Sequence, residues 1–268
     1  MKNPPDILGK IASQTILRVA KAKEVLSPEQ AHSQALALAA KDSRTSALPF
    51  ENAVSAPGLS FICEVKKASP SKGVIAPDFP WMEIAKDYEQ AGAAAISVLT
   101  EPEFFLGSEQ YLREIAAKVK IPVLRKDFII DEYQIYEAKL WGAKAVLLIC
   151  ALLEKETLSS YIAAAGKLAL DCLVEIHNEE EAREAIEAGA RIIGINNRDL
   201  TTFNVDTELS SRLQKFIPAG TLTVAESGIK SAEEVRALKD LSIDAVLIGE
   251  SLMRAADRKA FLRELVSA

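Results

Sequence analysis

Short apolar runs alternate with polar stretches along most of this chain. From Leu59 onward, Ile, Val, Leu and Ala gather in runs that lack the alternation of a half-exposed strand. The runs begin near Ser60, Ala94, Ile121, Ala143, Asp171, Arg191, Thr221 and Ile243. Continuous apolar runs of this kind are typical of parallel strands that are buried on both faces. The pattern therefore predicts eight buried strands.

Amphipathic stretches with a helical period lie between these runs. The clearest of them cover residues 81–91, 131–141, 179–188 and 231–238. Glycine follows three helical stretches, at Gly92, Gly142 and Gly189, as a left-handed helix end requires. Strands that are each followed by a helix predict an α/β fold, a (β/α)8 TIM barrel formed by residues 49–268. We expect no linker and no second domain.

Residues 1–48 show helical periodicity and no clear strand. Ile7, Ile11 and Val19 recur at roughly helical spacing, and residues 28–41 are rich in alanine. A proline at position 28, directly after a serine, is a typical helix start. The prediction is an N-terminal helical extension, residues 1–48, that packs on the barrel within one overall domain.

Composition limits the partners and the compartment. Hydrophobic residues make up 49% and charged residues 26% of the 268 positions, which is ordinary for a globular protein with a sizeable core. The net charge of −6 argues against nucleic acid or an anionic membrane as the main partner, although a local cationic pocket for an anionic small molecule is compatible with it. No apolar stretch could span a membrane, and no signal peptide is evident. We expect a cytoplasmic protein that is a monomer or a weak homo-oligomer.

Three cysteines offer no metal-binding pattern. Cys63, Cys150 and Cys172 each fall within an apolar run, and their spacing matches no metal motif. We interpret them as small buried hydrophobes in a reducing compartment. The sequence predicts no metal site.

Polar residues stand at or just past the ends of several predicted strands. In a (β/α)8 barrel the C-terminal strand ends converge on one mouth, where the chemistry of such barrels occurs. Two lysines and three carboxylates at one mouth indicate an acid–base site. These strand-end residues are Glu64, Lys66, Lys126, Glu175, Asn196, Glu226 and Ser227.

Strand geometry gives directions to some of these side chains. Glu64 and Lys66 lie two positions apart, so both should point to the same face and could form a pair. Lys126 could project inward, while its neighbours Arg125 and Asp127 face the helix layer. His177 precedes a glutamate-rich helix, and we interpret it as a loop or helix-cap residue rather than a catalyst.

Two glycine-bearing turns follow the last two predicted strands. Gly228 follows the seventh strand, and Gly249 with Glu250 follows the eighth. Turns at these two places commonly hold a phosphate group in TIM barrels through backbone N–H groups. The sequence therefore predicts a phosphorylated ligand. We expect Glu250 to contribute its N–H while its side chain points outward.

Five motifs lie in order along the predicted strand ends. They are Glu64-x-Lys66-x-x-Ser69-Pro70-Ser71, Leu124-Arg125-Lys126-Asp127-Phe128, Glu175-Ile176, Gly194-Ile195-Asn196-Asn197-Arg198-Asp199-Leu200 and Ala225-Glu226-Ser227-Gly228-Ile229. A further motif is Ile96-Ser-Val-Leu-Thr100-Glu101 followed by Phe104-Phe105-Leu-Gly107-Ser108. Together these motifs closely resemble one known family, indole-3-glycerol phosphate synthase of tryptophan biosynthesis. The resemblance runs from about Pro49 to Arg254, and the N-terminal extension matches the family in position and length only.

The resemblance implies a lyase (a carboxy-lyase) that needs no cofactor. Its reaction converts 1-(2-carboxyphenylamino)-1-deoxyribulose 5-phosphate into indole-3-glycerol phosphate, carbon dioxide and water. Lys126 would be the principal general acid, Lys66 would hold the substrate carboxylate, and Glu175 would serve the dehydration as acid–base. Glu64 would pair with a lysine and with hydroxyls, and Asn196 would orient the substrate.

The resemblance also implies the binding contacts. The contacts fall into a polar set for the phosphate and substrate and an apolar set for the aromatic ring. Without the resemblance, we would interpret each residue of the apolar set as part of the ordinary hydrophobic core. The implied phosphate and substrate contacts are Ser69, Glu226, Ser227, Gly228, Gly249, Glu250 and Arg198. The implied apolar pocket for the aromatic ring is Pro70, Phe105, Phe128, Leu147 and Leu200.

Two alternatives stay open on sequence grounds. One is another phosphate-sugar barrel enzyme such as phosphoribosylanthranilate isomerase, which uses a cysteine and an aspartate; here Cys63 precedes Glu64 but faces the other way. The other is a catalytically inactive barrel that binds a ligand, against which the presence of Lys66, Lys126 and Glu175 argues.

Overall fold

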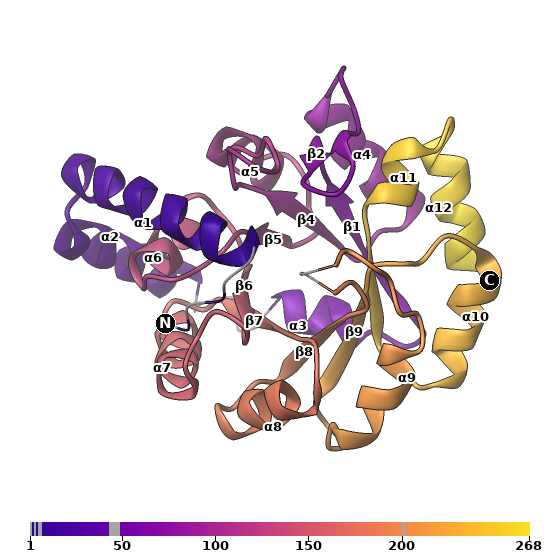
Figure 1. Cartoon of the computed structure of the whole chain (residues 1–268). Coiled ribbons are helices and arrows are strands. Elements are labelled where there is room, and N and C mark those ends of the chain that lie inside the picture. The colour runs from indigo at the N-terminus through magenta and orange to yellow at the C-terminus, as the bar shows by residue number, and fades with distance from the viewer. Residues whose placement is uncertain (1, 3, 5–6, 43–48, 200–201) are drawn as a thin grey trace.

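Eight parallel strands close into a barrel, as the sequence predicts. The computed structural model describes residues 2, 4, 7–42, 49–199 and 202–268. Each strand pairs with the next one along the chain, and β1 closes the barrel by pairing with both β4 and β10 (Figure 1). The strands are β1 (Ser60–Val65), β4 (Ala95–Leu99), β5 (Val123–Lys126), β6 (Ala145–Ile149), β7 (Asp171–Ile176), β8 (Ile192–Asn196), β9 (Leu222–Glu226) and β10 (Ala245–Ile248).

Helices surround the barrel and bury the outer faces of its strands. Gly92, Gly142 and Gly189 follow α4, α6 and α8 with positive φ angles, which confirms the predicted helix ends. The helices are α4 (Trp81–Ala91), α5 (Glu109–Ala116), α6 (Tyr133–Leu140), α7 (Lys155–Lys167), α8 (Glu179–Glu187), α9 (Leu209–Leu213), the short 3-10 helix η2 (Gln214–Phe216), α10 (Ala232–Asp240), α11 (Glu250–Arg254) and α12 (Arg258–Ser267).

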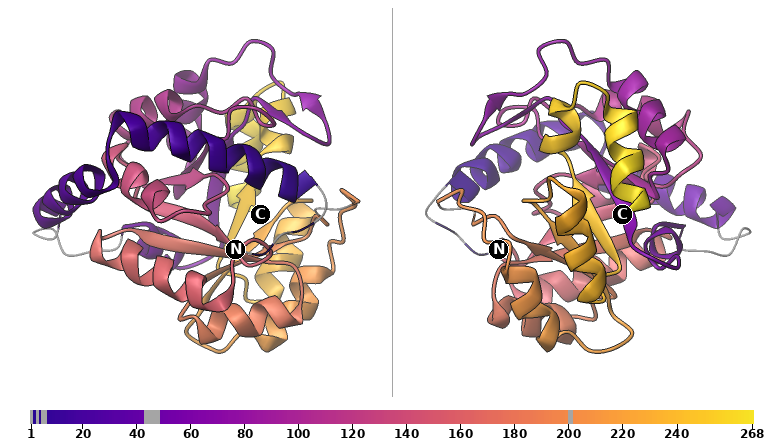
Figure 2. Two further views of the ribbon diagram at one scale, coloured as in Figure 1. Left: turned by 60° about the vertical axis from the view of Figure 1, so that its left-hand side comes forward. Right: turned by 90° about the vertical axis from the view of Figure 1, so that its right-hand side faces the viewer.

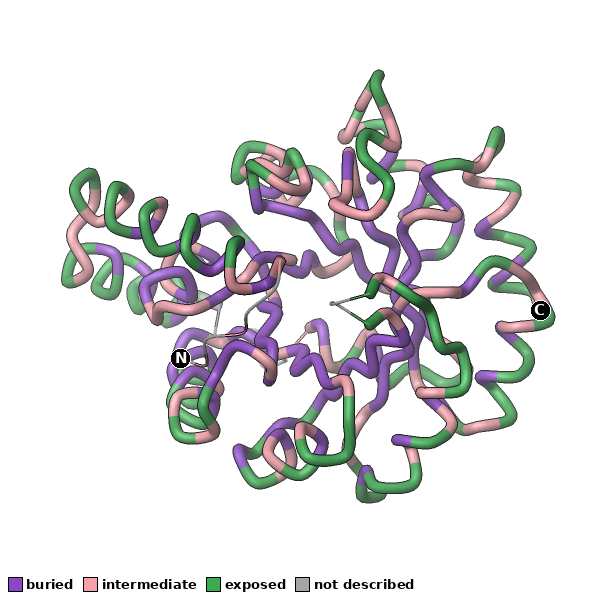
Figure 3. Tube along the Cα trace, viewed as in Figure 1, coloured by how far each residue is buried: buried purple, intermediate pink, exposed green. Residues whose placement is uncertain are grey.

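The hydrophobic core fills the barrel and the layer between the strands and the helices. Every residue of β1, β4, β6 and β8 is buried (Figure 3). Both faces of each strand are covered, which is why the sequence shows continuous apolar runs instead of alternation. Cys63 and Cys150 are buried in this core, while Cys172 is only partly buried.

The N-terminal helices lie against the outside and the ends of the barrel. Helix α1 (Ile7–Val25) and helix α2 (Pro28–Asp42) lie beside α6 (Figures 1 and 2). The hydroxyl of Tyr133 in α6 donates to the carbonyl oxygens of Ala22 and Leu26. Helix α3 (Pro49–Val54) packs at the N-terminal ends of the strands, where Asp171 accepts hydrogen bonds from the first backbone N–H groups of α3.

A small hairpin that the sequence did not predict follows β1. Strands β2 (Ala68–Ser69) and β3 (Gly73–Val74) form an antiparallel pair beyond the barrel. Its Gly73 adopts a φ of 63°, a left-handed conformation that a tight turn requires. The hairpin carries serine and lysine side chains to the rim of the barrel mouth.

Candidate active site

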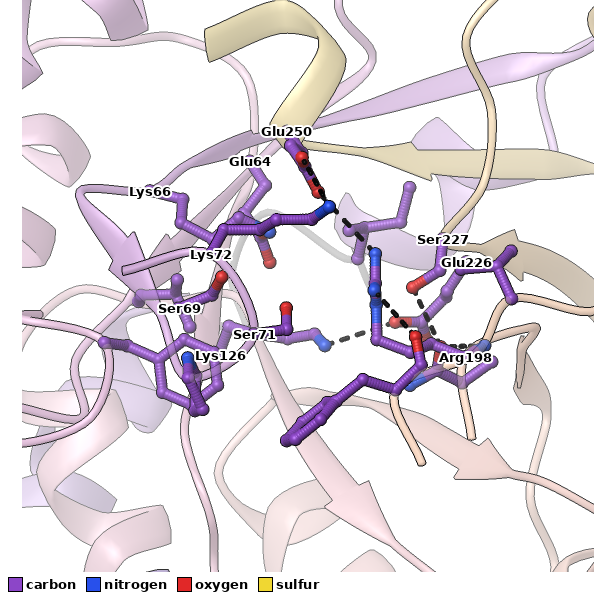
Figure 4. Close-up of a pocket in the computed structure, with 18 of the residues that line it drawn as sticks. Glu64, Lys66, Ser69, Ser71, Lys72, Lys126, Arg198, Glu226, Ser227 and Glu250 are labelled. Atoms are coloured by element: carbon purple, nitrogen blue, oxygen red, sulfur yellow. Dashed lines mark hydrogen bonds and ion pairs between the residues drawn. The ribbon is translucent and has the colours of Figure 1, made fainter. Parts of the chain in front are cut away.

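A cavity of about 590 Å³ opens at the C-terminal ends of the strands. It collects polar side chains from five strands of the barrel, from the turn after β10 and from the hairpin after β1 (Figure 4). Every site residue predicted from the sequence lines this cavity, except Leu200, which lies outside the described residues. Residues separated by more than half the chain therefore share one space, because a closed barrel brings all its strand ends to one mouth.

Glu64 and Lys66 form a close ion pair on the inner wall at the end of β1. Lys66 Nζ lies 2.5 Å from Glu64 Oε2, and both side chains are largely buried. Burial opposes the charge on Glu64, but Lys66 and Lys126 outweigh it and lower the pKa of the carboxyl group. Gly249 leaves room for this pair, because a Cβ at that position would collide with the Glu64 carboxylate.

Lys126 lies between two buried carboxylates at the end of β5. Its Nζ is 3.2 Å from Glu226 Oε2 and 3.3 Å from Glu175 Oε2. Burial disfavours the ammonium, but the charges of Glu226, Glu175 and Glu64 outweigh burial and raise the pKa of Lys126 well above its usual value. Lys126 is therefore a charged donor that faces the centre of the cavity.

Glu175 and Glu226 respond to this environment in opposite ways. Burial alone would raise the pKa of Glu175, but Lys126 and the imidazole of His177 lower it well below its usual range. Burial raises the pKa of Glu226 to about 7; Lys126 opposes that shift, and the negative charge of Glu175 adds to it. One carboxyl group is thus ionised while its neighbour holds a proton near neutral pH, a division of roles typical of acid–base sites.

The sequence around these groups provides space and orientation. Gly194 in β8 is needed because a Cβ there would collide with the Glu226 carboxylate. Asn196 donates from Nδ2 to Glu175 Oε1 at 3.2 Å, and its Oδ1 accepts a hydrogen bond from the hydroxyl of Ser227 at 2.9 Å. The amide of Asn196 therefore links the acid–base cluster to the turn after β9.

The turns after β9 and β10 form the end of the cavity where the sequence predicts a phosphate. Ser227 and Gly228 have φ angles of 67° and 87°, and positive φ is unusual for a serine. A strained backbone at this place is typical of a functional turn. Ser69 from the hairpin and Arg198 from the loop after β8 line the same cavity.

The prediction that the Glu250 side chain points outward is wrong. Its carboxylate lines the cavity and lies 3.8 Å from Lys72 Nζ, 3.7 Å from Arg198 Nη2 and 3.2 Å from Arg254 Nε (Figure 4). Three cations around this position hold the side chain against the rim. Lys72, from the hairpin after β1, also lines the cavity.

Apolar side chains form the other end of the cavity. The rings of Phe105 and Phe128 lie 5.8 Å apart, and Pro70 and Leu147 line the same cavity. The loop that carries Phe105 is fixed by the buried carboxylate of Glu101, which accepts hydrogen bonds from three consecutive backbone N–H groups. An aromatic ring of a ligand would find an apolar surface here.

Several lining residues were missed by sequence reasoning. Helix α1 begins over the mouth and contributes Ile7, Leu8 and Ile11 to the cavity. The loop after β8 contributes Phe203, Asn204 and Val205, and the hairpin contributes Ser71. The spacing of Ile7 and Ile11 does indicate an apolar helix face, but nothing in the sequence says what that face covers.

Helix α1 is anchored directly beside Lys126. Arg18 donates from Nη2 to Asp127 Oδ1 at 2.7 Å, and Thr100 and Arg125 donate to the other oxygen of the same carboxylate. Burial opposes the charge on Asp127, but Arg18 and Arg125 lower its pKa to about 2. Arg125 faces α6, as predicted, where it contacts Gln134 and Glu137. Asp127 turns toward Arg18 of α1 at the edge of the cavity, and Lys126 between them faces the cavity.

Cys63 does not take part in the site. It is buried, and burial raises the pKa of its thiol well above the usual value. It does not line the cavity, so the arrangement differs from that of a cysteine–aspartate isomerase. Within the described part of the chain, no group of three His, Cys, Asp or Glu side chains is placed to hold a metal ion.

The fold and the site define a (β/α)8 barrel whose mouth holds a cluster of buried, paired lysine and carboxylate side chains. The family model described as indole-3-glycerol phosphate synthase matches residues 8–265. The chain belongs to the indole-3-glycerol phosphate synthase family. The match includes the N-terminal helices, in which the sequence showed no motif of its own.

Individual relatives agree with this assignment. The indole-3-glycerol phosphate synthase of Ruminiclostridium cellulolyticum is 56% identical over 97% of this chain and 98% of its own length. That of Endomicrobium trichonymphae is 53% identical over 97% of this chain and 99% of its own length.

Solved structures show the fold alone. A 3-hexulose-6-phosphate synthase has a TM-score of 0.64 at 15% identity, covering 78% of this chain and 99% of its own. The protein KGPDC from Streptococcus mutans has a TM-score of 0.62 at 11% identity, covering 78% and 96%. None of the described helices is long and apolar enough to cross a membrane.

Proposed function

We propose that this protein closes the indole ring: it converts 1-(2-carboxyphenylamino)-1-deoxyribulose 5-phosphate into indole-3-glycerol phosphate, carbon dioxide and water. The single observation that carries the assignment of roles is the position of Lys126, a buried ammonium between two carboxylates of different protonation. It lies between the apolar end and the turns after β9 and β10, which suits a substrate with an aromatic ring at one end and a phosphate at the other.

Ring closure requires a donor at the ketone oxygen. The ring carbon that bears the carboxylate attacks the carbonyl carbon, and negative charge develops on the oxygen. Lys126 is the general acid for this oxygen because its ammonium faces the cavity and its pKa is raised. Lys66, at the rim beside Glu64, holds the substrate carboxylate until carbon dioxide leaves and the ring regains aromaticity.

Dehydration requires a base and an acid. Glu175 is ionised and lies beside Lys126, so it serves as the base that removes a proton from the new ring in the last step. Lys66, released from the substrate carboxylate when carbon dioxide leaves, donates the proton with which the hydroxyl departs as water. Asn196 orients Glu175, and Glu64 pairs with Lys66 and binds substrate hydroxyls. Glu226 holds a proton near neutral pH and supports Lys126 as a neutral hydrogen-bond donor or acceptor.

The phosphate is held by backbone and cations at the end of the cavity opposite the aromatic pocket. Ser69, Ser227, Gly228 and Gly249 provide hydroxyl and N–H donors, and Arg198 provides charge. Pro70, Phe105, Phe128 and Leu147 bind the aromatic ring. Leu200 stays a member of this pocket by resemblance only.

The experiment that tests these roles is steady-state kinetics of Lys126→Met and Glu175→Gln. Indole product is followed by ultraviolet absorbance, and carbon dioxide release is measured in parallel. Glu175→Gln should bind substrate nearly as well as the wild type while turnover falls, because the amide keeps the shape but cannot transfer a proton. A Glu175→Gln enzyme with wild-type turnover would exclude the acid–base role.

We also propose residues 1–48 as an extension that packs on a barrel of residues 49–268. The contacts of α1 and α2 with α6, and of α1 with the mouth, support this division. A cytoplasmic location and a monomeric or weakly associating state stay predictions, which cell fractionation and analytical ultracentrifugation would measure.

A further inference from the structure

One buried titratable group beside the site has no role in the mechanism above. His177 follows β7 directly, and its side chain is 14% exposed. It lies near the N-terminus of α8, as the sequence analysis expected, where its backbone N–H donates to Glu181 Oε2 at 2.8 Å. A residue that only ended a loop would not need to turn its ring back toward the barrel.

The imidazole of His177 contacts two carboxylates at once. Its Nδ1 lies 3.0 Å from Glu181 Oε2, and its Nε2 lies 3.3 Å from Glu175 Oε1. The second contact has ion-pair distance but not hydrogen-bond alignment, so Nε2 is a buried donor whose bond is not yet formed. Catalytic contacts of this kind often tighten only when substrate binds.

Glu181 is itself held rigidly. It accepts hydrogen bonds from the backbone N–H of His177 and from Nδ2 of Asn178, and its own N–H donates to Asn178 Oδ1. The ring of His177 is therefore fixed by a carboxylate that the start of α8 holds in place. The orientation of α8 thereby sets the position of a positive charge beside Glu175.

His177 also stands in the wall between two cavities. Glu175 lines the active-site cavity, whereas His177 and Glu181 line a second cavity of about 390 Å³ on the other side. Asn196 lines both. The remaining charged side chains of the second cavity are Asp199, Asp206 and Arg212, and Arg212 pairs with Asp206.

We propose that His177 is a positioning residue for the proposed acid–base group Glu175: its imidazolium fixes Oε1 of Glu175 so that Oε2 faces Lys126. This inference rests on the role proposed for Glu175. The carboxylate is thereby held by Lys126 at 3.3 Å on one side and by His177 and Asn196 on the other. Without His177, the carboxylate would lose one of its two cations and could rotate away from Lys126.

The charge state of the ring agrees with this geometry. Burial disfavours the imidazolium, but contacts with Glu175 and Glu181 raise the pKa of His177 to about 10. The raised value means that the ring stays positive until the pH rises through about 10. Glu175 shifts in the opposite direction, so both partners are charged across the neutral range.

The main test compares His177→Gln with the wild type in steady-state kinetics across pH. Losing one charge-assisted contact should lower kcat by roughly ten- to a hundredfold and leave KM within about twofold. The acidic limb of the kcat profile should move to higher pH, because the pKa of Glu175 rises once the imidazolium is gone. An unchanged limb together with an unchanged kcat would overturn the proposal.

A matched control separates positioning from damage to α8. Ala185→Gly weakens the interior of the same helix, because glycine is a poorer helix former than alanine, and it keeps the side-chain contacts of His177 with both carboxylates. It should lower the melting temperature while the acidic limb stays in place. If Ala185→Gly moves the limb as far as His177→Gln does, His177 acts only through the helix.

A double variant tests whether His177 acts through Glu175. The turnover of His177→Gln/Glu175→Gln should equal that of Glu175→Gln alone. Once the Glu175 carboxylate has been replaced, removing the residue that positions it should have no further effect on turnover. Additive losses would mean that His177 acts elsewhere. Wild-type turnover of Glu175→Gln would instead reject the role of Glu175, so the two failures are distinguishable.

Two further measurements keep the proposal testable if one variant folds poorly. Added imidazole should partly restore turnover to His177→Ala, because the vacated site adjoins the second cavity, and should not affect Ala185→Gly. The chain has only two histidines, so nuclear magnetic resonance can follow the ring of His177 in the wild type and in Glu175→Gln. The pKa of His177 should fall in Glu175→Gln; no change would contradict the contact.

Discussion

Lys126 Nζ lies 3.2 Å from Oε2 of Glu226, a carboxyl group whose pKa burial raises to about 7. A cation normally lowers the pKa of a carboxyl group. Here burial and the negative charge of Glu175 outweigh Lys126. Near neutral pH, Glu226 therefore holds a proton that a carboxyl group in water would have lost. That proton lies next to Lys126, the proposed general acid.

Glu226→Gln should stabilise the protein more at pH 8 than at pH 5. The folded-state pKa of Glu226 lies above the ordinary value of 4.5, so the native state binds the proton more tightly. The favourable contribution is complete below pH 4.5 and is lost as pH rises through about 7. Melting temperatures of both proteins at the two pH values measure the difference, and an equal shift at both would contradict the raised pKa.

Lys126→Met should lower kcat by at least about a thousandfold with little change in KM, because a general acid at the ketone oxygen acts mainly on the transition state. Lys66→Met should raise KM as well, since its contact with the substrate carboxylate exists from the first encounter. Circular dichroism confirms folding of both variants. If Lys126→Met keeps more than roughly a tenth of wild-type kcat, Lys66 becomes the leading candidate for the acid.

Gly194→Ala should lower both stability and kcat, because the new methyl group takes the space of the Glu226 carboxylate. Overpacking of this kind costs about 1–3 kcal/mol. Gly166→Ala is the matched control: Gly166 lies near the end of α7 with open space around it, so the change should be neutral or stabilise by up to about 1 kcal/mol. Urea unfolding and kinetics measure both, and a neutral Gly194→Ala would show that the carboxylate can move.

Arg18→Met should destabilise the protein by about 1–3 kcal/mol, because the buried Asp127 loses one of its two cations. Turnover should also fall, since Asp127 directly follows Lys126. Lys23→Met on the same helix removes a more exposed ion pair with Asp131 and should cost less than about 1 kcal/mol. Urea unfolding measures the free energy of unfolding of both variants. If Arg18→Met and Lys23→Met lose equal amounts of it, the contact of Arg18 with Asp127 contributes no more than an exposed ion pair.

Glu250→Gln should lower KM by a few fold, because removing a negative charge near Arg198 and Lys72 reduces repulsion of the substrate phosphate; partly exposed charges are worth about 0–1 kcal/mol. The effect should weaken at high salt. Glu187→Gln, which removes a surface charge paired with Lys155, serves as the control and should leave KM unchanged. A raised KM would mean that Glu250 orders the rim rather than opposing the phosphate.

The sequence alone determined the barrel. Each strand is covered on both faces, so its buried residues form a continuous apolar run that can be recognised locally. The predicted helix 81–91 matches α4, and its C-terminal glycine has the expected positive φ. Strand-end residues such as Lys126 and Glu175 could be assigned to one mouth because parallel strands in a closed barrel all end on the same side.

Only the tertiary structure decided how these groups interact. Lys126 and Glu226 are a hundred positions apart, and their separation depends on the closure of the barrel rather than on local pattern. The inward position of Glu250 follows from cations on three different segments, and the placement of α1 over the mouth follows from the contact between Arg18 and Asp127. Periodicity reports which face of an element is apolar, whereas the partner of that face is set by packing between distant parts of the chain.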